Sequence, residues 1–356
     1  MLATANCSTK GVPVNTLIPQ TAAKIRAAYF FAFLSSIFAI GGALSDAYIS
    51  RNIITAPQPA DKMAAACAYL TLGGIVGSII FIALACTPFG RVLDPKHRKL
   101  GLGSACFQAH SALSGSLSAI VTGIYLFAFQ QGHSAATLVA LSASRILWTI
   151  AYEHVRSADR VFPKVFVLPA CLMVAGVWIG EGLSNVTLEV FLLIFVLSGC
   201  IGGISEVHDK LAAREAGATM ATVWRFIYLG ASGTLLSAFY VWNAEKMTPY
   251  VNLLLEGFRR AMPAILILMT FNFLANGWSS RAKAELGDMG ASAVILVSNL
   301  RIVGVLVALG IIQYVFGTDA FGLLPSDTPL LVRKVISALV ITVSVMLLLT
   351  KSGQKE

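Results

Sequence analysis

The apolar run AATLVALSASRILWTIAY, residues 135–152, contains a single arginine, Arg145, near its middle. A second run, ASAVILVSNLRIVGVLVA at residues 291–308, aligns with it without gaps and places Arg301 opposite Arg145. An arginine at the centre of a membrane helix is unfavourable by roughly 2.5 to 3.5 kcal/mol on insertion scales. Two arginines at matching positions in two apolar runs therefore indicate a shared purpose.

The composition places the chain among integral membrane proteins. Of its 356 residues, 57% are hydrophobic and only 12% are charged, and the mean hydropathy is +0.78. A soluble domain of this length needs more polar residues on its surface, whereas here apolar runs long enough to cross a hydrocarbon core recur along the chain. The net charge of +9 fits basic cytoplasmic loops better than a nucleic-acid partner. We therefore expect a lipid bilayer around this chain and no nucleic acid.

Apolar runs between charge clusters predict an all-α integral membrane fold with about ten transmembrane helices. The predicted spans are 27–49, 63–86, 104–130, 134–152, 164–180, 187–205, 221–243, 259–279, 290–313 and 333–350. With the N-terminus inside, sixteen of the 26 Lys and Arg residues, Lys210 and Lys283 among them, fall in inner segments and seven in outer segments. This excess predicts a protein of the cell (inner) membrane with both termini cytoplasmic.

Two further matches follow the order of the twin arginines. Residues 40–46, IGGALSD, resemble residues 201–206, IGGISE, and the dipeptide Lys-Val opens the fifth span at 164 and the tenth at 334. Three matches in the same order predict two five-helix halves. An odd number of spans per half inverts the second half in the membrane, which is the architecture of many transporters.

The predicted organisation has four parts. They are a cytoplasmic N-terminal segment (1–26), a first five-helix repeat (27–181), a second five-helix repeat (187–350) and a cytoplasmic C-terminal tail (351–356). Transporters with inverted repeats bind their substrates near the bilayer midplane, where the halves meet.

This layout resembles the drug/metabolite transporter superfamily in its EamA-like form. The resemblance rests on the two five-span halves and on a fifth span of the type KVFVLPACLMVAGVWIG, residues 164–180. It implies an all-helical secondary transporter that moves a small organic solute. Where that family commonly has a proline in the middle of spans four and nine, this chain has an arginine in each. Glu153 and Gly317 are loose matches for the Gly-Glu pair that closes those spans in the family.

Arg145 and Arg301 are the leading candidates for substrate binding. A guanidinium offers a fixed fork of donors that matches a carboxylate or phosphate, and desolvation strengthens that pairing. The alternative is a structural role, in which each arginine bonds helix-end carbonyls or an internal acid. Ser142, Ser298 and Asn299 precede the arginines by two or three residues, and the two serines share a helical face with their arginines. Serines in membrane helices often bond their own backbone instead.

Asp46 and Glu206 form a second candidate pair, at symmetric positions near the ends of the first and sixth spans. They are candidates for gating or ion coupling, and the alternative is an ordinary helix-end carboxylate in the headgroup region. His110, in the third span, is a candidate proton relay, and a buried, hydrogen-bonded histidine is its alternative. Arg225, beside Trp224, is predicted to extend toward the membrane interface.

Small residues recur at every fourth position in the third span, which is typical of a close-packed helix face. They are Ser111, Gly115, Ala119 and Gly123. The six cysteines lie singly, without metal-ligand or disulfide spacing, and are expected to pack as small apolar residues.

Together these features favour a secondary transporter that moves a small organic solute, preferably an anionic metabolite, by alternating access. The chain carries no ATP-binding or catalytic motif, so we expect an ion gradient or exchange to supply energy, with no cofactor and no metal. Two other classes stay open. One is a lipid flippase, and the other is a membrane-embedded enzyme with a metal held at the cytoplasmic face by Glu206, His208 and Asp209. A homodimer is compatible with all of these readings.

Overall fold

The computed structural model describes residues 22–156, 164–181, 188–287, 290–317 and 328–353. Within these ranges the regular structure is helical and contains no strand. Residues 1–21 of the predicted N-terminal segment 1–26 and residues 354–356 of the predicted tail 351–356 lie outside the described residues.

The helices follow the predicted apolar runs closely. In chain order they are α1 (Ala22–Asn52), α2 (Lys62–Cys86), α3 (Pro88–Leu93), α4 (Ala105–Gln130), α5 (Ala135–Leu141), α6 (Arg145–Arg156), α7 (Lys164–Glu181), α8 (Leu188–Phe191), α9 (Gly199–Ala216), α10 (Ala218–Asn243), α11 (Met247–Arg260), α12 (Met262–Glu285), α13 (Gly290–Ser298), α14 (Arg301–Phe316) and α15 (Thr328–Gly353). Short 3-10 turns stand at Pro59–Asp61 and Ser142–Ser144, and a π-helical segment at Leu192–Ser198 joins α8 to α9.

Seven segments of the described chain have the length and hydropathy to cross a membrane. They are Ala22–Asn52, Pro59–Cys86, Ala105–Gln130, Ala135–Arg156, Leu188–Ala216, Met262–Glu285 and Gly290–Val315. The chain therefore has the properties of an integral membrane protein with an all-helical fold.

Side chains at the helix termini explain several of the boundaries. Ser104 begins α4 by accepting a hydrogen bond from the backbone N–H of Phe107 at 3.0 Å. Ser134 begins α5 in the same way, accepting from Thr137 N–H at 3.2 Å. A serine in this position satisfies one of the free N–H groups of the first helical turn. At the other end of a helix, Gly217 follows α9 with φ of +90°, a conformation that favours glycine.

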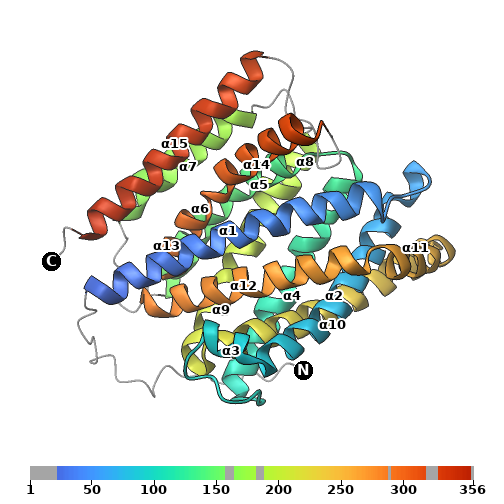
Figure 1. Ribbon diagram of the computed structural model, residues 1–356, viewed down its shortest axis with the longest axis horizontal. Coiled ribbons are helices and arrows are strands. Elements are labelled where there is room, and N and C mark those ends of the chain that lie inside the picture. The colour runs from blue at the N-terminus through green and yellow to red at the C-terminus, as the bar shows by residue number, and fades with distance from the viewer. Residues whose placement is uncertain (1–21, 157–163, 182–187, 288–289, 318–327, 354–356) are drawn as a thin grey trace.

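The long helices pack in pairs that join early and late parts of the chain (Figure 1). Helix α1 lies along α12, and α4 lies along α9. Helix α2 packs against α10, while α7 and α15 form a separate pair at the edge of the molecule. The core is thus assembled from helices that are far apart in sequence.

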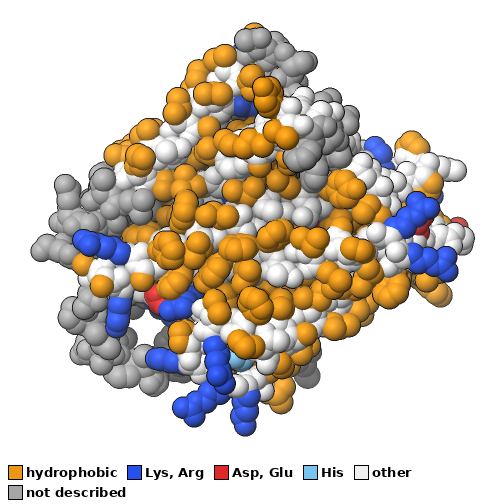
Figure 2. Space-filling view, in the orientation of Figure 1, with side chains coloured by type: hydrophobic (Ala, Val, Ile, Leu, Met, Phe, Trp, Pro, Cys, Tyr) orange, Lys and Arg blue, Asp and Glu red, His pale blue; other side chains and the backbone are white. Residues whose placement is uncertain are grey.

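The surface divides into an apolar middle and two charged ends (Figure 2). Hydrophobic side chains cover most of the face shown, and Lys and Arg gather at its two opposite ends, near α3 and near α11. On α10 the large side chains of Leu235, Phe239 and Trp242 are 71 to 76% exposed. Apolar side chains exposed between charged ends are what a bilayer-embedded helix requires.

Two helices break at the arginines that the sequence comparison paired. Helix α5 ends at Leu141, a 3-10 turn follows, and α6 begins at Arg145. Helix α13 ends at Ser298, and after a two-residue turn α14 begins at Arg301. The serine three residues before each arginine donates to the carbonyl three residues earlier, Ser142 to Val139 at 2.6 Å and Ser298 to Ile295 at 3.0 Å. Both serines therefore bond their own backbone.

Helices α2 and α10 approach closely enough to bring their backbones into contact. A Cβ added at Gly74 would lie 2.7 Å from the Cα of Gly230. Ser78 donates to the carbonyl of Phe226 across the same contact at 3.2 Å. The predicted close-packed face of α4 meets α10 at Gly115, where an added Cβ would clash with the carbonyl oxygen of Arg225. Further along the same face, a Cβ added at Gly123 would meet only Leu70, at 3.5 Å.

We predict that Gly74→Ala destabilises the protein and that Gly123→Ala does not. The first substitution forces two backbones apart, and such overpacking costs about 1 to 3 kcal/mol. The second adds a methyl group at ordinary contact distance and improves helix propensity. Thermal unfolding of the purified variants in detergent measures the difference, and equal midpoints for both variants would contradict the close approach of α2 and α10.

Candidate functional site

A cavity of about 290 Å³ lies among α1, α2, α4, α9, α10, α12 and the two broken helices. It contains seven of the eight site residues predicted from the sequence. They are Asp46, Ser142, Arg145, Glu206, Ser298, Asn299 and Arg301. The eighth, His110, does not line it.

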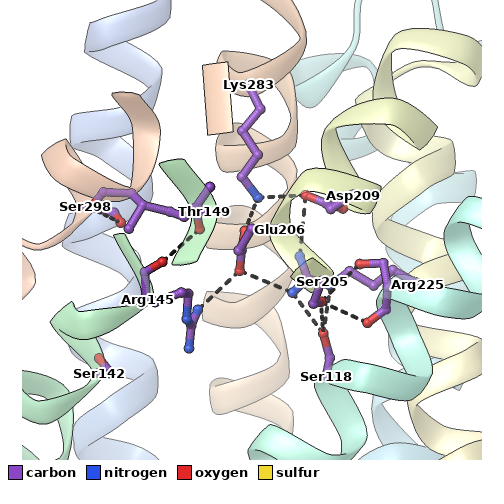
Figure 3. Close-up of polar contacts among 12 residues, drawn as sticks. Ser118, Ser142, Arg145, Thr149, Ser205, Glu206, Asp209, Arg225, Lys283 and Ser298 are labelled. Atoms are coloured by element: carbon purple, nitrogen blue, oxygen red, sulfur yellow. Dashed lines mark hydrogen bonds and ion pairs between the residues drawn. The ribbon is translucent and has the colours of Figure 1, made fainter. Parts of the chain in front are cut away.

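Arg145 reaches from the start of α6 toward α9. Its Nη1 donates to Glu206 Oε1 at 3.1 Å, as Figure 3 shows. Gly202 makes this approach possible, since a Cβ there would lie 2.7 Å from Arg145 Nε. That Nε is buried and has no hydrogen-bond partner among the described residues. Arg145 is thus bonded to an internal acid, as its structural alternative predicts, and its Nε is still a free donor within the described chain.

Arg301 is bonded more weakly than its twin. Its Nη2 donates to the hydroxyl of Ser142 at 3.0 Å, so the two broken helices touch through the paired positions. Its Nε is buried without a partner among the described residues, as is the Nδ2 of neighbouring Asn299. Within the described chain no carboxylate lies at ion-pair distance from Arg301. A guanidinium with an unsatisfied buried N–H is a strong donor for an anion.

Glu206 and Asp209 form the centre of a cluster of buried charges, which we call the charge cluster (Figure 3). Lys283 of α12 donates to Glu206 and also to Asp209, the latter at 2.7 Å. Arg225 of α10 lies 3.4 Å from Glu206 and 3.3 Å from Asp209. Ser118 of α4 accepts from Arg225 at 2.9 Å, which ties a fourth helix to the cluster. Lys283 and Asp209 are each 1% exposed.

Positive charge exceeds negative charge in this region. Four basic side chains, Arg145, Arg225, Lys283 and Arg301, stand with two carboxylates, Glu206 and Asp209. The difference, four minus two, is two positive charges, and an ionised Asp46 across the cavity would reduce it to one. An interior that carries unneutralised positive charge favours an anionic ligand.

Asp46 lies apart from the charge cluster. Its Oδ1 accepts from the hydroxyl of Tyr69 on α2 at 2.6 Å. Within the described residues no cation is at ion-pair distance from Asp46. The two members of the predicted carboxylate pair therefore differ, since Glu206 has several cations beside it and Asp46 has a neutral phenol.

His110 belongs to a small network outside the cavity. Its Nδ1 lies 2.8 Å from Nδ1 of His208, whose Nε2 lies 3.0 Å from the hydroxyl of Tyr152. His110 is half-buried, and these contacts fit both the proton relay and the hydrogen-bonded histidine that the sequence predicts as alternatives. The described residues hold no group of three or more His, Cys, Asp or Glu side chains arranged for a metal. Glu206 and Asp209, proposed as metal ligands in the enzyme alternative, are instead bonded to basic side chains.

Three basic residues are not where the sequence placed them. Arg225 was predicted to reach the membrane interface, and it is 9% exposed and bonded to Glu206 and Asp209. Lys210 and Lys283 were counted in loops, and both are buried within helices. In each case a buried carboxylate attracts the basic side chain inward, because isolated acids in the interior are far less stable than paired ones. The spacing of Glu206 and Asp209, one helical turn apart on a single face, is the signal that could have indicated buried partners.

We predict that Lys283→Met lowers the free energy of unfolding by about 3 to 5 kcal/mol, because it leaves buried carboxylates with fewer cations. Adding Asp209→Asn should recover part of this loss, since the double variant removes one charge of each sign. Thermal unfolding of the two single variants and the double variant forms a mutant cycle. Strictly additive losses would contradict the direct bond between Lys283 and Asp209.

In comparisons with known proteins, no family model matches the chain and no curated protein sequence matches it.

Proposed function

We propose that this chain is a secondary transporter that carries a small organic anion across a membrane by alternating access. One observation carries the proposal. Two arginines stand at the breaks of two matching helices and face one cavity, and one of them, Arg301, has no acidic partner among the described residues. Broken helices around a central cavity are a common way for transporters to form a substrate site.

The helix pairing supports an inverted repeat of two five-helix halves. Under the predicted repeat, α1 corresponds to α9 and α4 corresponds to α12. The contact of α1 with α12 then corresponds to the contact of α9 with α4, and both pairs pack together. The repeat also relates α2 to α10 and α7 to α15, so each of these two contacts joins a helix to its own counterpart. Such contacts are expected for helices that lie beside a two-fold axis. The same layout follows from the resemblance to the drug/metabolite transporter superfamily.

Ten membrane crossings are part of this proposal. Each of the ten predicted apolar runs coincides with a helix or with a broken helix of the described chain. Ten crossings put both termini on one side, and the excess of basic residues in the inner segments assigns that side to the cytoplasm.

The substrate is held through its negative charge. Arg145 and Arg301 offer buried donors that no described residue satisfies, and Asn299 adds an amide donor beside them. The surplus of positive charge is neutralised when an anion enters, which makes carboxylates and phosphates the favoured ligands. Glu206 bonds Arg145 at 3.1 Å, so an entering anion competes with an internal carboxylate for that arginine.

Asp46 is the best placed residue for ion coupling. It lines the cavity beside a phenol rather than a cation, and a carboxylate in such surroundings can take up or release a proton as the surroundings change. The chain has no ATP-binding motif, so coupling to an ion gradient or exchange of solutes would supply the energy.

We predict that succinate, citrate, inorganic phosphate or glycerol phosphate raises the unfolding temperature of the purified protein, while amines and neutral sugars do not. A ligand present at about 100 times its Kd stabilises the folded state by about 2.7 kcal/mol. Arg301→Gln should remove the effect, and Arg145→Gln should weaken it strongly.

Arg281→Gln is the matched control. This arginine also lies on a cavity helix, α12, but it pairs with Glu285 at 2.9 Å and stacks on Phe31 outside the cavity. It should retain the full stabilisation by anions. Equal stabilisation of all four proteins by amines or neutral compounds would mean that Arg145 and Arg301 have structural roles.

A further inference from the structure

The cavity reaches the helix ends on one side of the molecule and stops short on the other. On one side its lining includes Phe129, next to the end of α4, and Leu138 in the first turn of α5. On the other side the lining stops at Ser35 on α1, although α1 begins at Ala22, and at Ser118 on α4, which begins at Ala105. We call this second side, where α6 and α9 end and α13 begins, the latch end.

A buried carboxylate joins three helices at the latch end. Glu153, in the last turn of α6, is 3% exposed. It accepts hydrogen bonds from the backbone N–H of Ala291 at 3.1 Å and of Ser292 at 3.0 Å, and from the Ser292 hydroxyl. Lys210 of α9 pairs with the same carboxylate. The first turn of α13 is therefore capped by a side chain from another helix.

The corresponding position at the opposite side has no such contact. The sequence alignment that pairs Arg145 with Arg301 pairs Glu153 with Leu309, which cannot accept a hydrogen bond through its side chain. Helix α5, the counterpart of α13, is capped locally by its own Ser134. Among the described residues, the cross-helix cap is thus present at one end of the cavity and absent from the matching place at the other.

These contacts have the properties of a reversible contact between helices. The free N–H groups at the start of α13, the Glu153 carboxylate and the Lys210 ammonium are all groups that water solvates well. The carboxylate lies in the last turn of α6 and the N–H groups in the first turn of α13, so water can replace each partner once these helix ends separate. A carboxylate that caps a helix across an interface can therefore exchange between two stable arrangements, one bonded and one hydrated.

We propose that Glu153 is a latch that closes the cavity at the latch end, and that its release from α13 and Lys210 opens the cavity to that side. This inference rests on the proposed transport function and adds the gate of that same site. The excess of basic residues predicts that the latch end faces the cytoplasm.

Thiol labelling tests the latch without any cargo. The six cysteines are replaced by alanine, and Thr122, a cavity residue of α4, is changed to Cys as the reporter. A membrane-impermeant maleimide is then applied to right-side-out and to inside-out membrane vesicles. With Glu153 intact, we expect the reporter to react from the side opposite the latch end and to react slowly from the latch end.

Glu153→Ala should speed labelling from the latch end by about tenfold or more, and Glu153→Gln should have an intermediate effect because it keeps an acceptor but loses the charge. Lys210→Met removes the bond from Lys210 to Glu153 and should also speed labelling from the latch end. If the Glu153→Ala protein does not accumulate in the membrane, Lys210→Met provides the test instead. Asp61→Asn is the control, since it breaks the ion pair with Lys246, 2.9 Å long, on the opposite side. It should leave labelling from the latch end unchanged.

Unchanged labelling from the latch end in both Glu153→Ala and Lys210→Met would overturn the proposal, as would rapid labelling from that end with Glu153 intact. The anion panel reports on the cavity and the labelling reports on the gate. If the variants react faster from the latch end but no anion binds, the latch stands and the anionic substrate is rejected. If anions bind but labelling of the variants is unchanged, the anionic substrate stands and the latch is rejected.

Discussion

A charge buried in the interior of a membrane protein must find its counter-charge nearby, and this constraint organises the centre of the molecule. Lys283 on α12 satisfies both Glu206 and Asp209, so α9 and α12 cannot separate without leaving buried charges unpaired. Arg225 adds α10 to the same centre. Arg145 then brings α6 to α9, which the missing side chain of Gly202 permits. The cavity lies between this cluster and helices α1 and α2, which the bond between Asp46 and Tyr69 joins.

The broken helices follow from the same constraint. A continuous apolar helix offers nothing to bind a solute at mid-depth, because all its backbone groups are bonded within the helix. At the second break the backbone N–H groups stay bonded through a tight turn, with Asn299 donating to Ile295 and Leu300 to Val297 at 3.0 Å each, and the 3-10 turn before Arg145 does the same at the first. The donors that the breaks offer to the cavity are therefore the side chains of Arg145 and Arg301. These side chains make the local environment favourable to an anion.

Much of this arrangement can be predicted from sequence, because it depends on local or repeated patterns. The length of the apolar runs predicts the helices, and the twin arginines predict two positions that prove to lie on one cavity. The partners of the carboxylates could not be predicted. Arg225 beside a tryptophan is typical of a residue at the membrane interface, and Lys283 lies in the charged run RAKAE, which is typical of a loop. Their true positions depend on Glu206 and Asp209, which come close only after α9, α10 and α12 have packed.

The charge cluster and the Glu153 contacts place similar groups in different surroundings, and their dynamics should differ accordingly. Around Lys283, Asp209 is 1% exposed and is enclosed by α9, α10 and α12, so breaking its bonds leaves charges unsolvated and this part of the cluster stays closed. Around Glu153, the partners are the first turn of α13 and the buried Lys210. Because Glu153 lies in the last turn of α6, separation of the helix ends exchanges each bond for one with water. A net hydrogen bond to a charged group is worth about 1.5 to 3 kcal/mol, small enough for thermal opening when only a few are involved. Under the proposed repeat, the charge cluster forms a rigid centre, and the departure from the repeat at Glu153 makes the two ends unequal, as the proposed alternating access requires of a molecule at rest in one of its two states.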